Sequence, residues 1–189
     1  MRSTLVIMVK VPRLGRVKTR LGRDIGMVPA TWWFRHQVRR LLRQIEDPRW
    51  DVVLAVAPDI EGVSSRCWPA HFARWPQGRG NLGDRMVRMM RCVGGPVCVI
   101  GADVPGITRA HIADGFAALG RHDAVFGPAL DGGYWLIGVK LGSVLHPCAL
   151  DGVRWSSEHA LADSRVAFAG KRIALISTLA DVDTGDDLP

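Results

Sequence analysis

The stretch GADVPGIT, residues 101–108, places a single carboxylate directly after a short apolar run. Asp103 follows the run PVCVI at residues 96–100, and Pro105 stiffens the chain behind it. Aspartate and proline are both common in turns, so a purely structural role is one interpretation. A carboxylate at the end of a strand is also a good ligand for a metal or a substrate. The role of Asp103 therefore depends on what the fold brings beside it.

A strongly basic stretch, KVPRLGRVKTRL at residues 10–21, directly follows the apolar run at residues 4–9. Its positive side chains gather around Gly15, and they are Lys10, Arg13, Arg16, Lys18 and Arg20. A loop with this charge, and with a glycine that lets the backbone approach, suits a phosphate-bearing ligand. The Walker A pattern is absent, and a solvated basic loop is the alternative.

The stretch WPQGRGNLGDRM, residues 75–86, contains glycines with the spacing G-x-G-x-x-G at positions 78, 80 and 83. Gln77 and Gly78 are candidates for contact with a nucleotide, because the glutamine could hydrogen-bond a base or a sugar. The sequence predicts no clear strand in front of this stretch, so it is a weak dinucleotide fingerprint. A flexible loop is the alternative interpretation.

Acidic residues follow two later apolar runs. Asp131 lies in DGG between two predicted strands and is first interpreted as part of a hairpin turn. Asp181 and Asp183 lie two residues apart, so in an extended segment they point to the same side. Together with Asp103 they would form a hard oxygen site suited to Mg²⁺ or Mn²⁺. Alternatively, Thr184 begins a short helix and the acids after it are structural.

The apolar runs predict how these residues are positioned. Strands are expected at residues 4–9, 51–57, 96–101, 123–127, 134–139 and 172–177, and most of these runs are continuously apolar, as in strands covered on both faces. Helical spacing is found over residues 34–45 and 82–93, a third helix is expected after Thr108, and a fourth from Ser156 or Ser157 to Gly170. This alternation predicts an α/β fold with a mainly parallel sheet, where ligands bind at the carboxyl ends of the strands.

Composition favours one soluble domain over residues 1–189, without a membrane span and located in the cytoplasm. The net charge of +7 is uneven, since residues 1–50 hold twelve basic against three acidic side chains and residues 151–189 hold four against seven. Two such poles suggest a metal–diphosphate group between them. The basic first quarter and seven tryptophans leave a nucleic-acid binder as an alternative, although no nucleic-acid motif is found.

Taken together, KVPRLGRVKTRL, PQGRGNLGDRM, IGADVPGI, GPALDGGYWLIGV and DVDTGDDL resemble the DUF2064 family. The resemblance spans nearly the whole chain and implies a three-layer α/β/α nucleotide-diphospho-sugar transferase fold of the glycosyltransferase-A type. That fold is shared with molybdenum-cofactor and phospholactate guanylyltransferases. By motif, the resemblance assigns Lys18 and Arg20 to the phosphate loop, Asp103 to the central metal ligand, and Asp181 and Asp183 to the late acidic pair. GADVP offers one aspartate where many metal-dependent sugar transferases have D-x-D.

Two reactions follow from the resemblance. The favoured one is glycosyl transfer from a nucleoside-diphosphate sugar to a small-molecule acceptor, with Asp131 as a candidate base. The alternative is nucleotidyl transfer from a nucleoside triphosphate to a phosphorylated acceptor, to which the basic loop is suited. A nucleotide-binding protein without turnover is a further alternative. The sequence indicates neither the sugar, the base and the acceptor nor the oligomeric state.

Overall fold

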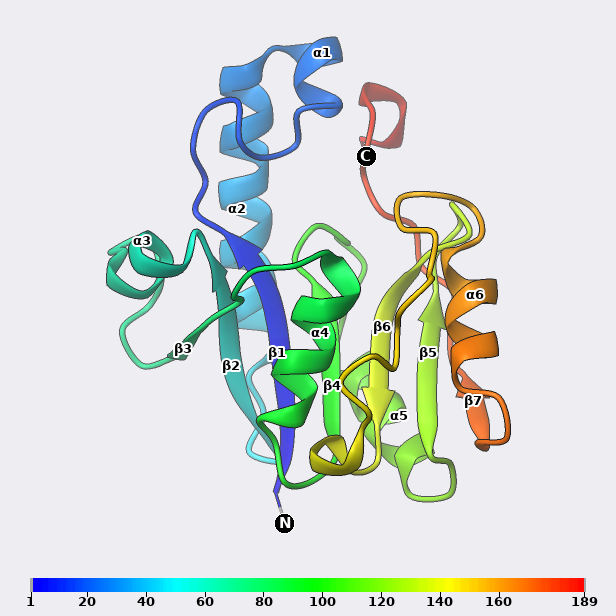
Figure 1. The fold of residues 1–189 in the computed structure, drawn as a ribbon. Coiled ribbons are helices and arrows are strands. Elements are labelled where there is room, and N and C mark those ends of the chain that lie inside the picture. Colours follow the sequence, from blue (N-terminus) through cyan, green and yellow to red (C-terminus); the bar gives the residue numbers. More distant parts are fainter. Residues whose placement is uncertain (1, 189) are drawn as a thin grey trace.

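The computed structural model describes residues 2–188, which form one seven-stranded sheet with helices on both faces (Figure 1). The elements, in chain order, are β1 (Ser3–Lys10), α1 (Leu21–Ile25), α2 (Met27–Ile45), β2 (Trp50–Ala57), α3 (Asp59–Ser64), β3 (Ala73–Pro76), α4 (Leu82–Arg91), β4 (Val97–Gly101), α5 (Arg109–Leu119), β5 (Ala124–Pro128), β6 (Tyr134–Val139), η1 (Gly142–Val144), α6 (Ala160–Ala167), β7 (Ile173–Leu175) and η2 (Gly185–Asp187).

The strand order is β3-β2-β1-β4-β6-β5-β7, and β6 is antiparallel to both of its neighbours. All other pairs are parallel, so the predicted mainly parallel sheet is confirmed. The six predicted strands are all present. The seventh, β3, was not predicted because none of its four residues is buried and one is a proline, which is typical of an edge strand.

Two apolar layers hold the helices against the sheet. On one face, Ile7 and Ile100 pack with Phe34 and Leu41 of α2 and with Ile112 of α5. On the other, Val6 and Val99 pack with Met90 of α4, and Phe168 after α6 joins the same cluster. Successive residues of a strand point to opposite faces, which is why neighbours such as Val6 and Ile7 serve different layers. The predicted three-layer α/β/α architecture is confirmed (Figure 1).

Two helices begin at the predicted capping residues, whereas both ends of the last helix differ from the prediction, since it stops at Ala167 and not at Gly170. The Asn81 side chain accepts a hydrogen bond from the Asp84 N–H at 3.0 Å, and Thr108 accepts one from the His111 N–H at 3.4 Å. The last helix, however, begins at Ala160 and not at the serines of residues 156–157. Ser156 has a φ of +58°, a left-handed conformation that cannot continue into a right-handed helix. None of the helices in the described part of the chain is long and apolar enough to cross a membrane.

The Arg154–Asp163 ion pair joins the segment before α6 to that helix. Because of this pair, we expect the folded protein to lose stability in acid. Asp163 accepts hydrogen bonds from the backbone N, Nε and Nη2 of Arg154 at 2.9–3.0 Å. The Arg154 side chain, and then its backbone N–H, lower the Asp163 pKa from 3.8 to about 2. The Asp163 pKa is lower in the folded state than in the unfolded chain. The ion pair therefore stabilises the fold fully above pH 3.8, and this stabilisation is lost as the pH falls through about 2.

We expect Asp163→Asn to flatten the decline in urea midpoint over this acid range, measured by chemical denaturation at several pH values. Asp114→Asn, at an exposed aspartate on α5, is the matched control and should leave the decline as it is in wild type. An equal decline in wild type and Asp163→Asn would contradict the assignment.

Candidate functional site

The candidate residues meet at one edge of the sheet. Strands β1, β4, β5 and β7 run in the same direction, so the segments that follow them share the carboxyl edge. These segments are the basic loop (residues 11–20), the β4–α5 loop (102–108), the β5–β6 connection (129–133) and the acidic tail (176–184). Leu179 N–H donates to Pro128 O at 3.1 Å and brings the acidic tail beside the β5–β6 connection.

Lys18 is the centre of the arrangement. Its Nζ lies 2.8 Å from Asp103 Oδ2 and 3.0 Å from Asp183 Oδ1, so one ammonium bridges the β4–α5 loop and the acidic tail. Arg20 Nη1 lies 2.9 Å from the other oxygen of Asp183. The Lys18 side chain is only 6% exposed, whereas those of Asp103 and Asp183 are 39% and 35% exposed. A buried cation therefore faces two carboxylates that remain open to solvent.

Buried apolar residues anchor the backbone segments that carry Asp103 and Asp183. Asp103 lies between Ala102 and Val104, which are both buried, and Gln37 Nε2 of α2 donates to Val104 O at 3.2 Å. In the acidic tail, Val182 packs in a small cluster with Leu21, just beyond the basic loop. The loop and the tail are thus held together by an apolar contact as well as by charge.

The charges of the site shift its pKa values. Burial alone would lower the pKa of Lys18, but contacts with Asp103 and Asp183 outweigh it and raise that pKa. Burial alone would raise the pKa of Asp183, but Lys18 and Arg20 outweigh it and lower that pKa. Near neutral pH both partners are therefore charged.

Asp181 differs from Asp183. Its pKa is raised, first by burial and then by the negative charges of Asp131, Asp183 and Asp103. Four carboxylates therefore interact at this edge, and Asp181 lacks the basic partners that Asp183 has. Asp131 is exposed, and its Oδ1 accepts a hydrogen bond from the Gly133 N–H at 2.8 Å in the connection between β5 and β6.

The oxygen donors fit a divalent cation in their chemistry, because carboxylates are the side chains that Mg²⁺ and Mn²⁺ prefer. Within residues 2–188, however, no group of three His, Cys, Asp or Glu side chains is arranged to hold a metal ion. Asp103 and Asp183 are instead bridged by Lys18. Protein carboxylates alone do not form a complete site here, so oxygens of a bound phosphate would have to supply further ligands. The assignment of Asp103, Asp181 and Asp183 as metal ligands stays a prediction.

Two further basic side chains predicted for phosphate binding lie at the same edge. Lys10 is the last residue of β1, and Arg16 lies in the basic loop; both are exposed. The Arg13 side chain instead pairs with α3, because its Nε lies 2.5 Å from Glu61 Oε1.

The comparisons with known proteins agree with this architecture. The profile of a family described as an uncharacterized protein conserved in bacteria, DUF2064, matches residues 40–157. The chain belongs to the DUF2064 family. The matched range includes Asp103 and Asp131 but not the basic loop or the acidic tail. A search of curated proteins found no significant match.

Solved structures place the DUF2064 protein in the nucleotide-diphospho-sugar transferase fold. A proposed nucleotide-diphospho-sugar transferase from Desulfovibrio desulfuricans G20 is 29% identical, with 97% of this chain and 84% of that chain aligned at a TM-score of 0.84. At 8% identity, a 4-diphosphocytidyl-2C-methyl-D-erythritol synthase from Anaerococcus prevotii DSM 20548 aligns over 98% and 94% with a TM-score of 0.60. At 14% identity, the manganese complex of Rv0371c from Mycobacterium tuberculosis H37Rv aligns over 99% and 95% with a TM-score of 0.58.

Gln77 of the DUF2064 protein has a different environment from the one expected. It is 3% exposed, and its Nε2 donates to Val9 O at 3.1 Å and to Ala55 O at 2.8 Å. These contacts join the ends of β1 and β2, so both amide hydrogens that a base could have used are engaged. The Gly78 N–H likewise donates to Asp59 Oδ1 at 3.1 Å. Both residues contribute to the framework of the glycine-rich loop.

Replacing Gln77 by leucine is expected to lower the free energy of unfolding by about 1–3 kcal/mol, because two buried carbonyls lose their donor. Urea denaturation measures this effect, and Gln44→Leu on the exposed face of α2 is the control. Unchanged stability combined with weaker nucleotide binding would instead support a direct contact with the ligand.

The acidic tail is also held by Asp24, which the sequence did not indicate, and by Asp187. Asp24 of α1 accepts a hydrogen bond from the Gly185 N–H at 2.9 Å and secures the chain directly after the acidic tail. Asp187 accepts hydrogen bonds from the backbone N–H groups of Asp183 and Thr184, at 3.0 and 2.7 Å. The structural role considered for the acids after Thr184 thus holds for Asp187. The sequence offered no signal for Asp24, since its partner is 161 residues away.

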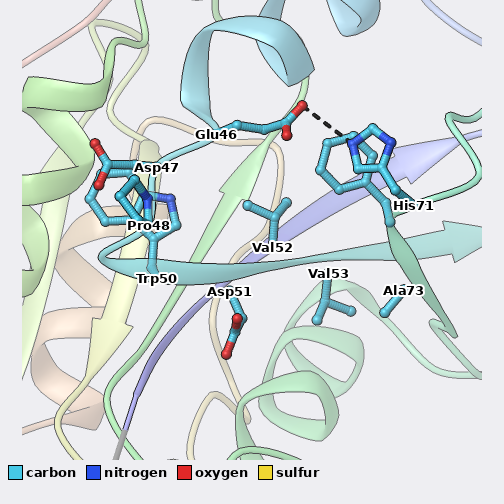
Figure 2. A pocket seen from close by; sticks show the side chains of 10 residues that line it. Glu46, Asp47, Pro48, Trp50, Asp51, Val52, Val53, His71 and Ala73 are labelled. Carbon is cyan, nitrogen blue, oxygen red and sulfur yellow. Dashed lines mark hydrogen bonds and ion pairs between the residues drawn. The ribbon is translucent and has the colours of Figure 1, made fainter.

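A cavity of about 620 Å³ lies elsewhere, at the amino-terminal ends of β2 and β3 (Figure 2). Its lining includes Trp50 and Asp51, and across it His71 Nε2 lies 3.3 Å from Glu46 Oε1. None of the candidate residues lines this cavity, which opens at the sheet edge opposite to them.

Proposed function

We propose that this protein is a transferase that uses a nucleotide-activated donor, and that glycosyl transfer from a nucleoside-diphosphate sugar is its reaction. The observation that carries the proposal is the Lys18 bridge, which joins a basic loop to two solvent-accessible carboxylates at the carboxyl edge of the sheet. That edge is where α/β sheets bind their ligands. Positive and negative side chains in contact there suit a phosphate group together with a cation.

In this proposal Lys18, Arg20, Lys10 and Arg16 bind the phosphates of the donor. Arg20 is 62% exposed and Lys10 and Arg16 are exposed, so they are free to rearrange around a ligand. Their positive charge stabilises the negative charge that develops on the departing nucleoside diphosphate. Asp131, exposed between β5 and β6, is the candidate base that takes the proton of an acceptor hydroxyl.

Asp103, Asp181 and Asp183 are the residues that would hold a divalent cation, Mg²⁺ or Mn²⁺. Such a cation, when bound, supplies Lewis-acid neutralisation of phosphate oxygens. The manganese complex of Rv0371c supports this part of the proposal by analogy of fold. Asp181 supports it on physical grounds, since a carboxylate crowded by three others is relieved by a cation.

Nucleotidyl transfer is the second candidate, and the excess of exposed positive charge in and directly before the basic loop favours it. Arg16 and Lys10 exceed what one bound diphosphate needs and would suit a phosphorylated acceptor. The fold relative from Anaerococcus prevotii, a synthase named for a diphosphocytidyl product, supports this alternative.

A product assay separates the two reactions. The purified protein is incubated with Mn²⁺ or Mg²⁺ and with panels of nucleoside-diphosphate sugars and nucleoside triphosphates, each with hydroxyl and phosphate acceptors. Release of nucleoside diphosphate supports glycosyl transfer, whereas release of pyrophosphate alone overturns it in favour of nucleotidyl transfer. Nucleotide binding without any product would leave a binding protein as the conclusion.

A further inference from the structure

Lys18 lies between the two carboxylates that are candidates for holding a cation. Its Nζ is within 3.0 Å of an oxygen from each, and its side chain is almost fully buried. Arg20 adds a second positive charge on Asp183 at 2.9 Å. An incoming divalent cation would therefore meet two positive charges, one of them buried, and two carboxylates that are already paired.

The position of Lys18 is built into the loop and is not an accident of a long flexible side chain. Its backbone has a φ of +45°, a left-handed conformation that is uncommon for residues other than glycine. Val17 before it is buried, as is Leu21 at the start of α1, so the backbone around Lys18 is anchored on both sides. The Gly22 N–H also donates to Lys18 O at 2.8 Å. A strained backbone that is held in this way commonly marks a functional position.

We propose that Lys18 excludes a free divalent cation from the Asp103–Asp183 pair and releases that pair when a polyphosphate binds. This inference rests on the proposed function. A polyphosphate offers Lys18 new anionic acceptors, and the four-carbon stem of lysine lets the ammonium turn toward them. The freed carboxylates then face a cation that the same polyphosphate helps to hold. The site thus selects a cation–polyphosphate complex over the free cation.

The test compares Mn²⁺ binding to wild type and to Lys18→Met, with free Mn²⁺ quantified by electron paramagnetic resonance. Without phosphate, we expect Lys18→Met to bind Mn²⁺ at least about tenfold more tightly than wild type, because the competing ammonium is gone. With inorganic pyrophosphate as the probe, we expect the opposite sign: Lys18→Met binds the Mn²⁺–pyrophosphate complex about tenfold more weakly, because a phosphate ligand is gone. A merely structural lysine would weaken both.

Two control variants keep the result interpretable if methionine disturbs the loop. Lys18→Arg retains the charge and should keep the weak binding of free Mn²⁺. Arg20→Met also removes one positive charge, but Arg20 contacts only Asp183 and is well exposed, so its effect on free Mn²⁺ should be less than about threefold. Equal effects of Arg20→Met and Lys18→Met would reduce the role of Lys18 to general electrostatics and overturn the inference.

The outcomes also separate this inference from the proposed function. If Lys18→Met binds free Mn²⁺ no more tightly than wild type, while wild type binds Mn²⁺–pyrophosphate and Asp103→Asn does not, the exclusion by Lys18 is wrong and the proposed site stands. If wild type binds neither free Mn²⁺ nor Mn²⁺–pyrophosphate, both are wrong.

Discussion

Asp103→Asn is expected to lower turnover of the nucleotide donor by about 100-fold or more, since it removes a negative charge that faces Lys18 and the proposed cation. The variant should still fold, because the asparagine oxygen can still accept a hydrogen bond from Lys18 and Asp183 remains as a charged partner of that lysine. The measurements are initial rates of release of nucleoside diphosphate or pyrophosphate, together with a thermal melt.

Asp114→Asn is the matched control for that experiment. Asp114 is an exposed aspartate on α5, the helix that follows the Asp103 loop, so the same change of charge is made away from the site. Turnover by Asp103→Asn equal to that of Asp114→Asn would remove Asp103 from the proposed site.

Gly132→Ala is expected to destabilise the fold by about 3 kcal/mol or more, through backbone strain and a backbone clash acting together. Gly132 has a φ of +83°, and a Cβ there would lie 2.6 Å from Glu158 Cα. The carbonyl of Gly132 also accepts a hydrogen bond from the Leu161 N–H at 3.0 Å, so displacement would disturb the start of α6. Urea denaturation followed by circular dichroism measures the loss.

Gly152→Ala provides the comparison that isolates the clash. Gly152 has a similar φ of +79°, but a Cβ there would meet no atom within 4 Å. Its substitution should cost only the strain of a left-handed alanine, about 1 kcal/mol. Equal losses for the two variants would show that the contact with Glu158 relaxes at no cost. Because Asp131 precedes Gly132, the first variant should also lower turnover more than the second.

The sequence predicted the secondary structure best where a strand is buried along its whole length. Six strands and the caps at Asn81 and Thr108 could be predicted because long apolar runs and capping side chains act locally. Strand β3 could not, since the edge of a sheet does not demand apolar residues on both faces. The late start of α6 depended on the left-handed backbone of Ser156, a conformation that the residue type does not reveal.

At the candidate site, the sequence indicated which residues would gather, but not which side chains they would contact. The carboxyl-edge rule correctly predicted that Lys18, Asp103 and the acidic tail would meet. It could not predict that the lysine would bridge the carboxylates, because that depends on side-chain packing between segments far apart in the sequence. Gln77 illustrates the same limit: the sequence places it in a glycine-rich loop, but only the sheet geometry shows its amide engaged by Val9 and Ala55.

The bridge from Lys18 to Asp183 joins positions 165 residues apart. Chains are synthesised and begin to fold from the amino-terminal end, so the basic loop exists long before the acidic tail is made. A nascent chain could pair β1 with β2 and expose Lys18 with no carboxylate from the tail opposite it. The pairing of Lys18 with both carboxylates therefore arises only after the chain has been made as far as Asp183.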